Sequence, residues 1–174
     1  NLQTIESHAF SFSNIKEISI PPSVTKICEY AFSDCKNLRK VSIPTISNLQ
    51  TIKTGAFSFS NIKEISIPSS VTKIYLSTFN HCKNLIKVTF PNNSNLQTIN
   101  AYAFSGSAIN SISIPPSVTR ICERAFSECN ELKIIEISEE SKLQSIHESA
   151  FFYCTKLIIM IPPSLNKLIQ AINS

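Results

Sequence analysis

The stretch "VTKICEYAFSDCKNLRKVSIP", residues 24–44, occurs in three versions along this chain. It returns as "VTKIYLSTFNHCKNLIKVTFP" at residues 71–91 and as "VTRICERAFSECNELKIIEIS" at residues 118–138, so its period is 47 residues. Self-similarity at a fixed period is typical of solenoid proteins, whose units bury their apolar faces only against neighbouring units. The stretch therefore predicts a stacked array of coils.

A phenylalanine in each copy shows that the 47-residue period contains two unequal units. Its equivalents are Phe10, Phe32, Phe57, Phe79, Phe104, Phe126 and Phe151, separated by 22, 25, 22, 25, 22 and 25 residues. We expect about seven coils in a single domain over residues 1–174, with residues 165–174 as a partial repeat or C-terminal cap. The opening phrase "NLQTI" recurs at residues 48–52 and 95–99, which indicates a fragment of a longer protein.

Each unit has three parts, which the second unit illustrates. A short extended piece, "VTKI" at residues 24–27, comes first. We expect "CEYAFSDC", residues 28–35, to form a short helical turn that carries its Ala and Phe into the core. In "LRKVSIP", residues 38–44, apolar and polar residues alternate with the period of a half-buried strand, and proline ends it. The repeat is therefore predicted to be of the α/β class.

The composition excludes several classes of function. Hydrophobic residues make up 43% of the 174 residues, which is enough for a buried core and argues against disorder. Two glycines are too few for phosphate-binding loops, and the net charge of +4 comes from dispersed residues, unlike the basic blocks of nucleic-acid-binding proteins. No apolar run approaches the roughly 18 residues that a membrane span needs.

The cysteines and histidines do not form a pattern typical of catalysis or metal binding. Cys35, Cys82 and Cys129 occupy one repeat position two coils apart, roughly 9–10 Å from one another, which is too far for a disulfide or a shared zinc ion. Cys154 follows Cys129 by one coil, so that pair alone is open to bridging; free thiols that pack as small apolar residues are the other interpretation. His8, His81 and His147 occupy three different repeat positions. We predict no catalytic, cofactor or metal site.

The outward-facing positions of the second strand form the candidate partner-binding strand face. Its residues are Lys16, Ser19, Arg39, Ser42, Lys63, Ser66, Thr89, Ser113, Lys133 and Glu136. One column places three cations, Lys16, Arg39 and Lys63, on successive coils, which costs stability unless something selects it. An acidic protein patch or a sulfated glycan would provide that selection, and solubility is the competing explanation. Residues Ile134, Ile158, Ile159 and Met160 add an apolar patch near the C-terminal end, or pack beneath a cap.

The consensus L-x-x-I-x-x-x-A-F-x-x-C-x-x-L-x-x-I-x-I-P resembles the BspA-like, or Treponema pallidum-type, leucine-rich repeats. It is carried by "ICEYAFSDCKNLRKVSIP" at residues 27–44 and by its six relatives. The resemblance implies a right-handed solenoid without catalysis or cofactor, displayed on the cell surface or secreted, that attaches to host extracellular-matrix or cell-surface proteins. The dispersed charge and the short apolar runs predict neither nucleic-acid binding nor membrane insertion of this segment. An intracellular protein–protein interaction scaffold on the same repeats is the alternative, and a purely structural spacer is a third interpretation.

Overall fold

The protein is described by a computed structural model over residues 2–166, in which every coil contributes two strands. The first strands of the coils are β1 (Thr4–Ile5), β3 (Lys26–Ile27), β5 (Thr51–Ile52), β7 (Lys73–Ile74), β9 (Thr98–Ile99), β11 (Arg120–Ile121) and β13 (Ser145–Ile146). The second strands are β2 (Glu17–Ser19), β4 (Lys40–Ser42), β6 (Glu64–Ser66), β8 (Lys87–Thr89), β10 (Ser111–Ile114), β12 (Ile134–Ile137) and β14 (Ile158–Met160). A 3₁₀ turn, η1 (Pro163–Leu165), follows β14.

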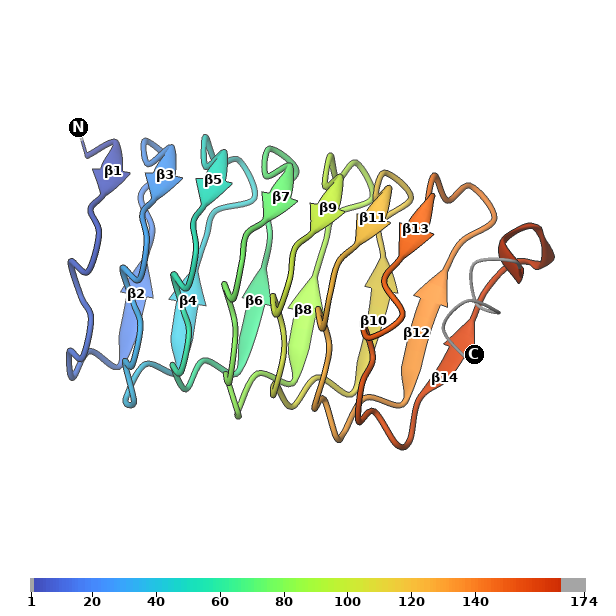
Figure 1. Cartoon of the computed structure of the whole chain (residues 1–174). Helices are drawn as coiled ribbons and strands as arrows, with labels where there is room; N and C mark the ends of the chain where they lie inside the picture. The colour runs from blue at the N-terminus through green and yellow to red at the C-terminus, as the bar shows by residue number, and fades with distance from the viewer. Residues whose placement is uncertain (1, 167–174) are drawn as a thin grey trace.

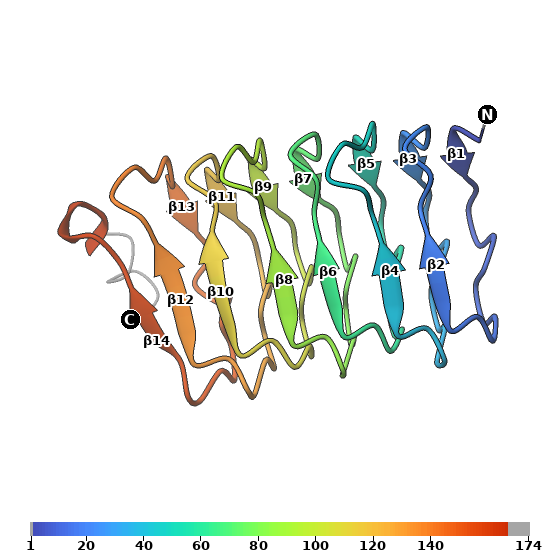
Figure 2. The ribbon, with the colours of Figure 1, turned by 180° about the vertical axis from the view of Figure 1, so that it is seen from behind.

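Parallel pairing between coils builds two opposite sides of the array. The odd-numbered strands form one seven-stranded sheet, and the even-numbered strands form a four-stranded sheet, β2-β4-β6-β8, followed by a three-stranded sheet, β10-β12-β14 (Figure 1). Seen from behind, the even-numbered strands run side by side along the whole rod (Figure 2). The connections between parallel strands wind in the usual right-handed sense. The predicted solenoid of about seven coils is confirmed.

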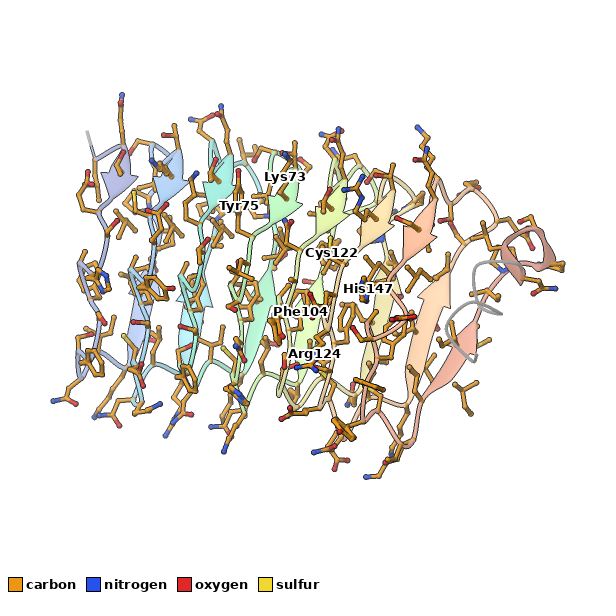
Figure 3. The ribbon with its side chains drawn as sticks, viewed as in Figure 1. Lys73, Tyr75, Phe104, Cys122, Arg124 and His147 are labelled. Atoms are coloured by element: carbon orange, nitrogen blue, oxygen red, sulfur yellow. The ribbon has the colours of Figure 1, made fainter. Side chains whose placement is uncertain are left out.

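The seven equivalent phenylalanines form a ladder through the interior. Neighbouring rings lie with their centroids 5.1–5.7 Å apart and their planes within 3–22° of parallel. Phe104, in the middle of the stack, has no solvent exposure (Figure 3). Branched apolar residues of both strands close around the ladder, and each of these side chains gains about 1.5–3 kcal/mol from burial before conformational entropy is subtracted. The interior is one continuous core.

The expected helical turns are not present, because the backbone around each core phenylalanine alternates in handedness. Tyr30 and Asp34, two residues before and after Phe32, both have φ near 55°, in the left-handed region that a right-handed helix cannot contain. The amides of Tyr30, Phe32 and Asp34 donate to carbonyl groups of the next coil at 3.0, 2.7 and 2.8 Å. A helix would use these donors within its own turn, so the intercoil bonds replace the helix. The segment is a succession of β-turns.

We call the positions two residues before and after each core phenylalanine the turn face. Its members with positive φ are His8, Phe12, Tyr30, Asp34, Gly55, Phe59, Ser77, His81, Tyr102, Gly106, Arg124, Glu128 and Tyr153. The turn face therefore forms a third row of hydrogen-bonded contacts along the rod, beside the two sheets.

Loops of alternating length explain why two kinds of unit are needed. The short loops, residues 21–23, 68–70 and 115–117, end in a serine whose hydroxyl donates to a leucine carbonyl of the preceding coil at 2.6–2.7 Å. The long loops, residues 44–48, 91–95 and 138–142, contain a serine whose hydroxyl accepts from the amide of a leucine two residues later at 3.2–3.3 Å. Each serine satisfies a different backbone group, so the two loop lengths have different hydrogen-bond patterns.

The C-terminal part of the expected cap is outside the described residues. Leu165 ends η1, and its half-buried side chain packs against the core. Residues 167–174 of the predicted partial repeat lie beyond the described range. Within residues 2–166 no helix is long and apolar enough to cross a membrane.

Candidate binding face

The structure places all ten predicted residues of the strand face on the side of the array formed by the even-numbered strands. Parallel registers join their hydroxyl column, with Ser19 opposite Ser42 and Ser66 opposite Thr89. Further along, Ser113 donates to the carboxylate of Glu136 at 2.7 Å. Alternation along each strand points the hydroxyl column outward. The four cations Lys16, Arg39, Lys63 and Lys133 lie one residue before their strands, and their side chains are exposed.

Three of the four predicted cations lie together. The amide of Arg39 donates to the carbonyl of Lys16 at 2.7 Å, and that of Lys63 to the carbonyl of Arg39 at 3.2 Å, so the three residues occupy successive coils. Their side chains are exposed, and among the described residues none of them forms an ion pair within 4 Å. Ile86, half exposed, and Asn110 separate them from Lys133. We call Lys16, Arg39 and Lys63 the basic column.

A ladder of alternating charge runs beside the basic column. Glu17 lies opposite Lys40, Lys40 opposite Glu64, and Glu64 opposite Lys87 in the parallel register. No ion pair within 4 Å joins these residues in the described part of the chain, so each contact contributes at most a few tenths of a kcal/mol. The ladder balances its own charge and leaves the basic column as the net positive feature of this face.

A groove opens at the end of strands β4, β6 and β8, where the short loop 68–70 lies between two long loops. One hollow of about 400 Å³ is lined by Ile43, Pro44, Ile46, Ser66, Pro68 and Asn93, among others. A second of about 360 Å³ lies over the strands, and its lining shares Ile43 and Ser66 with the first. Ile46, on the rim, is 89% exposed. The two hollows form one groove, with hydroxyl groups on its floor and an apolar rim.

Sequence reasoning missed the aromatic rows of the turn face. Phe12 is 76% and Phe59 42% exposed, although both occupy backbone positions that favour glycine. His8 stacks on Tyr30 at 5.3 Å, and the Tyr30 ring covers Gly55, where a Cβ atom would clash with it. Comparing the residues two positions from each core phenylalanine would have shown these columns in the sequence.

Cations accompany these rings. On the turn face, the ammonium group of Lys36 lies 5.4 Å from the ring centroid of Phe59. The ammonium group of Lys53 lies 4.8 Å from the ring centroid of Tyr75, which is four residues before Phe79 and so outside the turn face. Arg124 lies 5.8 Å from the Tyr102 ring and donates to its hydroxyl at 3.3 Å. Aromatic and arginine side chains are enriched in protein interfaces, so the turn face is a second candidate surface.

Comparison with known proteins identifies the repeat. The model of the BspA type leucine rich repeat region matches residues 3–133 and 84–172, with six copies. The chain belongs to this family. A search of curated proteins found no match for this BspA-type array.

Solved structures share the fold of this BspA-type array. A leucine-rich repeat protein of Treponema pallidum is similar with a TM-score of 0.78 at 24% identity, over 99% of this chain and 78% of that one. The pneumococcal vaccine antigen PcpA is similar with a TM-score of 0.76 at 20% identity, over 94% and 57%. A leucine-rich cell surface protein of Faecalibacterium prausnitzii is similar with a TM-score of 0.58 at 28% identity, over 81% and 44%. The chain spans about half the length of the pneumococcal and Faecalibacterium proteins.

The cysteines of this BspA-type array are unpaired thiols in the structure. Cys28, Cys35, Cys82 and Cys129 are buried, and Cys122 and Cys154 are half-buried. Among residues 2–166, no group of three or more His, Cys, Asp and Glu side chains is placed to hold a metal ion. The interior thiols therefore pack as small apolar groups.

One cysteine and one histidine come closer than the sequence indicated. Cys122 and His147 directly follow Ile121 and Ile146, which pair across adjacent coils, and both line a shallow hollow of about 640 Å³ (Figure 3). Burial raises the pKa of the Cys122 thiol, whereas a cysteine nucleophile needs a lowered one. The Nδ1 atom of His147 is engaged with the Ser149 hydroxyl at 2.9 Å. This pair does not have the features of an activated nucleophile.

Proposed function

We propose that this BspA-type array is a non-catalytic, adhesin-type binding module, displayed on the cell surface or secreted, which attaches to a host extracellular-matrix or cell-surface protein. The observation that carries the proposal is the combination of the basic column with the neighbouring groove on one exposed face. Cations steer an acidic partner toward the face, and the apolar rim at Ile46 supplies area that association can bury. The Faecalibacterium protein's description as a cell surface protein supports the location.

The charge and spacing of the basic column support an anionic partner. Three like charges on successive coils, roughly 5 Å apart along the rod, repel one another when no counter-charge is present. A carboxylate-rich protein surface would neutralise these charges, and the relief of their repulsion would add to the affinity. A sulfated glycan presents the same charge, and separate arms of the binding experiment distinguish the two.

The experiment compares two triple variants that change the charge equally. The purified chain is tested by interferometry at physiological salt against matrix proteins, cell-surface proteins and heparan sulfate. K16E/R39E/K63E reverses the basic column, whereas K26E/K73E/R120E reverses three cations of the other sheet, on β3, β7 and β11. We expect the first variant to lose about tenfold or more in affinity through slower association, and the second to bind nearly as the parent does.

A third variant tests the groove. Ile46 is 89% exposed, so Ile46→Asp leaves the fold intact and places a carboxylate on the rim. We expect this variant to weaken binding mainly through faster dissociation, since it removes contact area and not long-range attraction. Equal losses in both triple variants would show an effect of net charge alone, and retained binding in K16E/R39E/K63E would move the site to the turn face.

An intracellular interaction scaffold is the second candidate function, favoured by the six unpaired thiols. Protease treatment of intact cells that express the full-length parent separates the two. A surface module is digested from outside, whereas a scaffold is protected until the cells are lysed.

A further inference from the structure

The position three residues after each core phenylalanine alternates between serine and cysteine, with one exception. It reads Ser13, Cys35, Ser60, Cys82, Ser107, Cys129 and Cys154. Serine and cysteine alternate through six coils, and each serine hydroxyl lies 3.3–3.6 Å from the sulfur of the next cysteine. The seventh coil breaks the alternation, because cysteine follows cysteine there.

Backbone bonds on either side hold these two cysteines level with one another. Phe126 donates its amide to Ala150, and Glu128 donates to Phe152, both at 2.8 Å, so the two coils are in register around Cys129 and Cys154. The Cys154 sulfur donates to the Phe126 carbonyl at 3.0 Å, and the same oxygen accepts from the Cys129 amide at 3.3 Å. The Cys129 sulfur donates to the Phe104 carbonyl at 3.2 Å. Parallel neighbours at this spacing fall within the 4.4–6.8 Å range of Cα separations that a disulfide spans, roughly one strand spacing.

We propose that Cys129 and Cys154 are a redox pair that a low-molecular-weight disulfide, such as oxidised glutathione, converts into a disulfide bond between the sixth and seventh coils. The Cys154 thiolate attacks one sulfur of the oxidant, whose sulfur–sulfur bond breaks and releases one thiol. The Cys129 thiolate then attacks the Cys154 sulfur and displaces the second thiol. The protein loses two electrons and two protons, and the oxidant gains them.

The environments of the two sulfurs assign these roles. Cys154 is half-buried and so accessible to an oxidant, whereas Cys129 has no solvent exposure. The neighbouring thiol lowers the pKa of Cys154 and raises that of Cys129, which burial raises further. The attacking thiolate is therefore Cys154, and Cys129 is the resolving thiol.

The bond would close the weakest contact in the described array. The ring stack is loosest between Phe126 and Phe151, at 5.7 Å and 22°, and the outer strand β14 exposes Ile158 and Met160 at 65% and 55%. A covalent link there would restrain the loosest described step of the ring stack.

Peptide mapping of the whole chain tests the proposal. After incubation with oxidised and reduced glutathione at varied ratios, remaining thiols are alkylated and the chain is digested with trypsin. We expect a linked pair of peptides, residues 125–133 with residues 143–156, lighter by two hydrogens than the separate peptides together. Hydrogen exchange in β13 and β14 should slow once this link forms.

Two variants serve as controls. In Cys154→Ser, which restores the serine of the other odd coils, Cys82 and Cys129 lie two coils apart and should stay reduced. A variant with Cys28, Cys35, Cys82 and Cys122 changed to serine should still form the link. The parent chain alone decides the proposal if a variant does not fold: a stable glutathione adduct on Cys154, a link to another cysteine, or two thiols that stay alkylatable would each overturn it.

Discussion

At the scale of single residues, the turn face shows how the array tolerates left-handed backbone without glycine. Glu128 has φ of 59° and an exposed side chain, while its amide donates to Phe152 of the next coil at 2.8 Å. The left-handed conformation costs about 1–2 kcal/mol for a residue with a Cβ atom. Intercoil hydrogen bonds on both sides of each core phenylalanine hold the backbone in place despite this cost.

A pair of opposite substitutions measures the strain. Glu128→Gly removes the strain of the left-handed backbone at residue 128. Glycine also adds entropy to the unfolded chain, so the net rise in the free energy of unfolding should be about 0.5–1 kcal/mol. Gly55→Ala introduces the same strain at φ 61° and displaces the Tyr30 ring. It should lower the free energy of unfolding by about 1–2 kcal/mol. Urea unfolding of both variants checks this. A destabilised Glu128→Gly would contradict the account, and Tyr30→Ala should reduce the cost of Gly55→Ala.

The buried thiol of Cys82 makes stability depend on alkaline pH. Burial raises the pKa of Cys82 to about 12, whereas the unfolded thiol titrates near 8.5. Below about pH 8.5 both states are protonated and the full stability is present. As pH rises from there toward 12, only the unfolded state ionises, so the free energy of unfolding falls by about 1.4 kcal/mol per pH unit.

Replacement of Cys82 by serine, the residue of the neighbouring coils, should reduce this slope. Urea unfolding in the presence of reductant at pH 8, 9, 10 and 10.5 gives the comparison. Parallel pH profiles of the parent and Cys82→Ser would show that the thiol does not ionise on unfolding.

At the scale of elements, the strands could be predicted from the sequence and the turns could not. Period-two alternation around Ile18, Val41 and Ile65 specifies which face of each strand is buried. By contrast, Tyr30 is not a residue that favours positive φ, so its left-handed backbone has no local sequence signal, and Asp34 gives only a weak one. It is imposed by the next coil, whose carbonyl groups accept their amides. The groove could be predicted in part. The sequence shows the lengths of the loops that flank the groove, but it does not show how deep the groove is.

Loop exchange tests whether loop length builds the groove. Replacing residues 44–48, "PTISN", by the three-residue "PSS" of residues 68–70 removes the wall that carries Ile46. We expect the array to remain folded, since surface loops tolerate length changes, and binding to the partner to fall about as far as in Ile46→Asp. Circular dichroism and the interferometry assay measure the two outcomes. Undiminished binding by the folded exchange variant would exclude the groove from the site.

At the scale of the whole molecule, stability is a sum of coils and of contacts between neighbours. Phe79 lies in the middle of the ladder with no exposure, between Phe57 at 5.5 Å and Phe104 at 5.3 Å. Phe79→Ala should cost about 3–5 kcal/mol and weaken the coupling between the two halves of the array. Phe10→Ala in the first coil, where the ring is half-buried and stacks on Phe32 alone, should cost about half as much.

Denaturant unfolding, with hydrogen exchange as the readout for each coil, distinguishes these two variants. Phe79→Ala should split one transition into two, with separate exchange behaviour before and after the fourth coil, whereas Phe10→Ala should keep a single transition. Equal effects of the two substitutions would contradict a nearest-neighbour array.

Long and short loops alternate along the array, as do cysteine and serine. The true repeating unit is therefore a pair of coils. Unequal crossing-over between copies can therefore lengthen or shorten the rod in steps of 47 residues without disturbing the match between neighbours. The gain or loss of a single coil instead places two coils of the same kind next to each other, with like residues in contact. Cys129 and Cys154 bring like residues together in this way, although the loop at residues 162–164 keeps the short length of an odd coil.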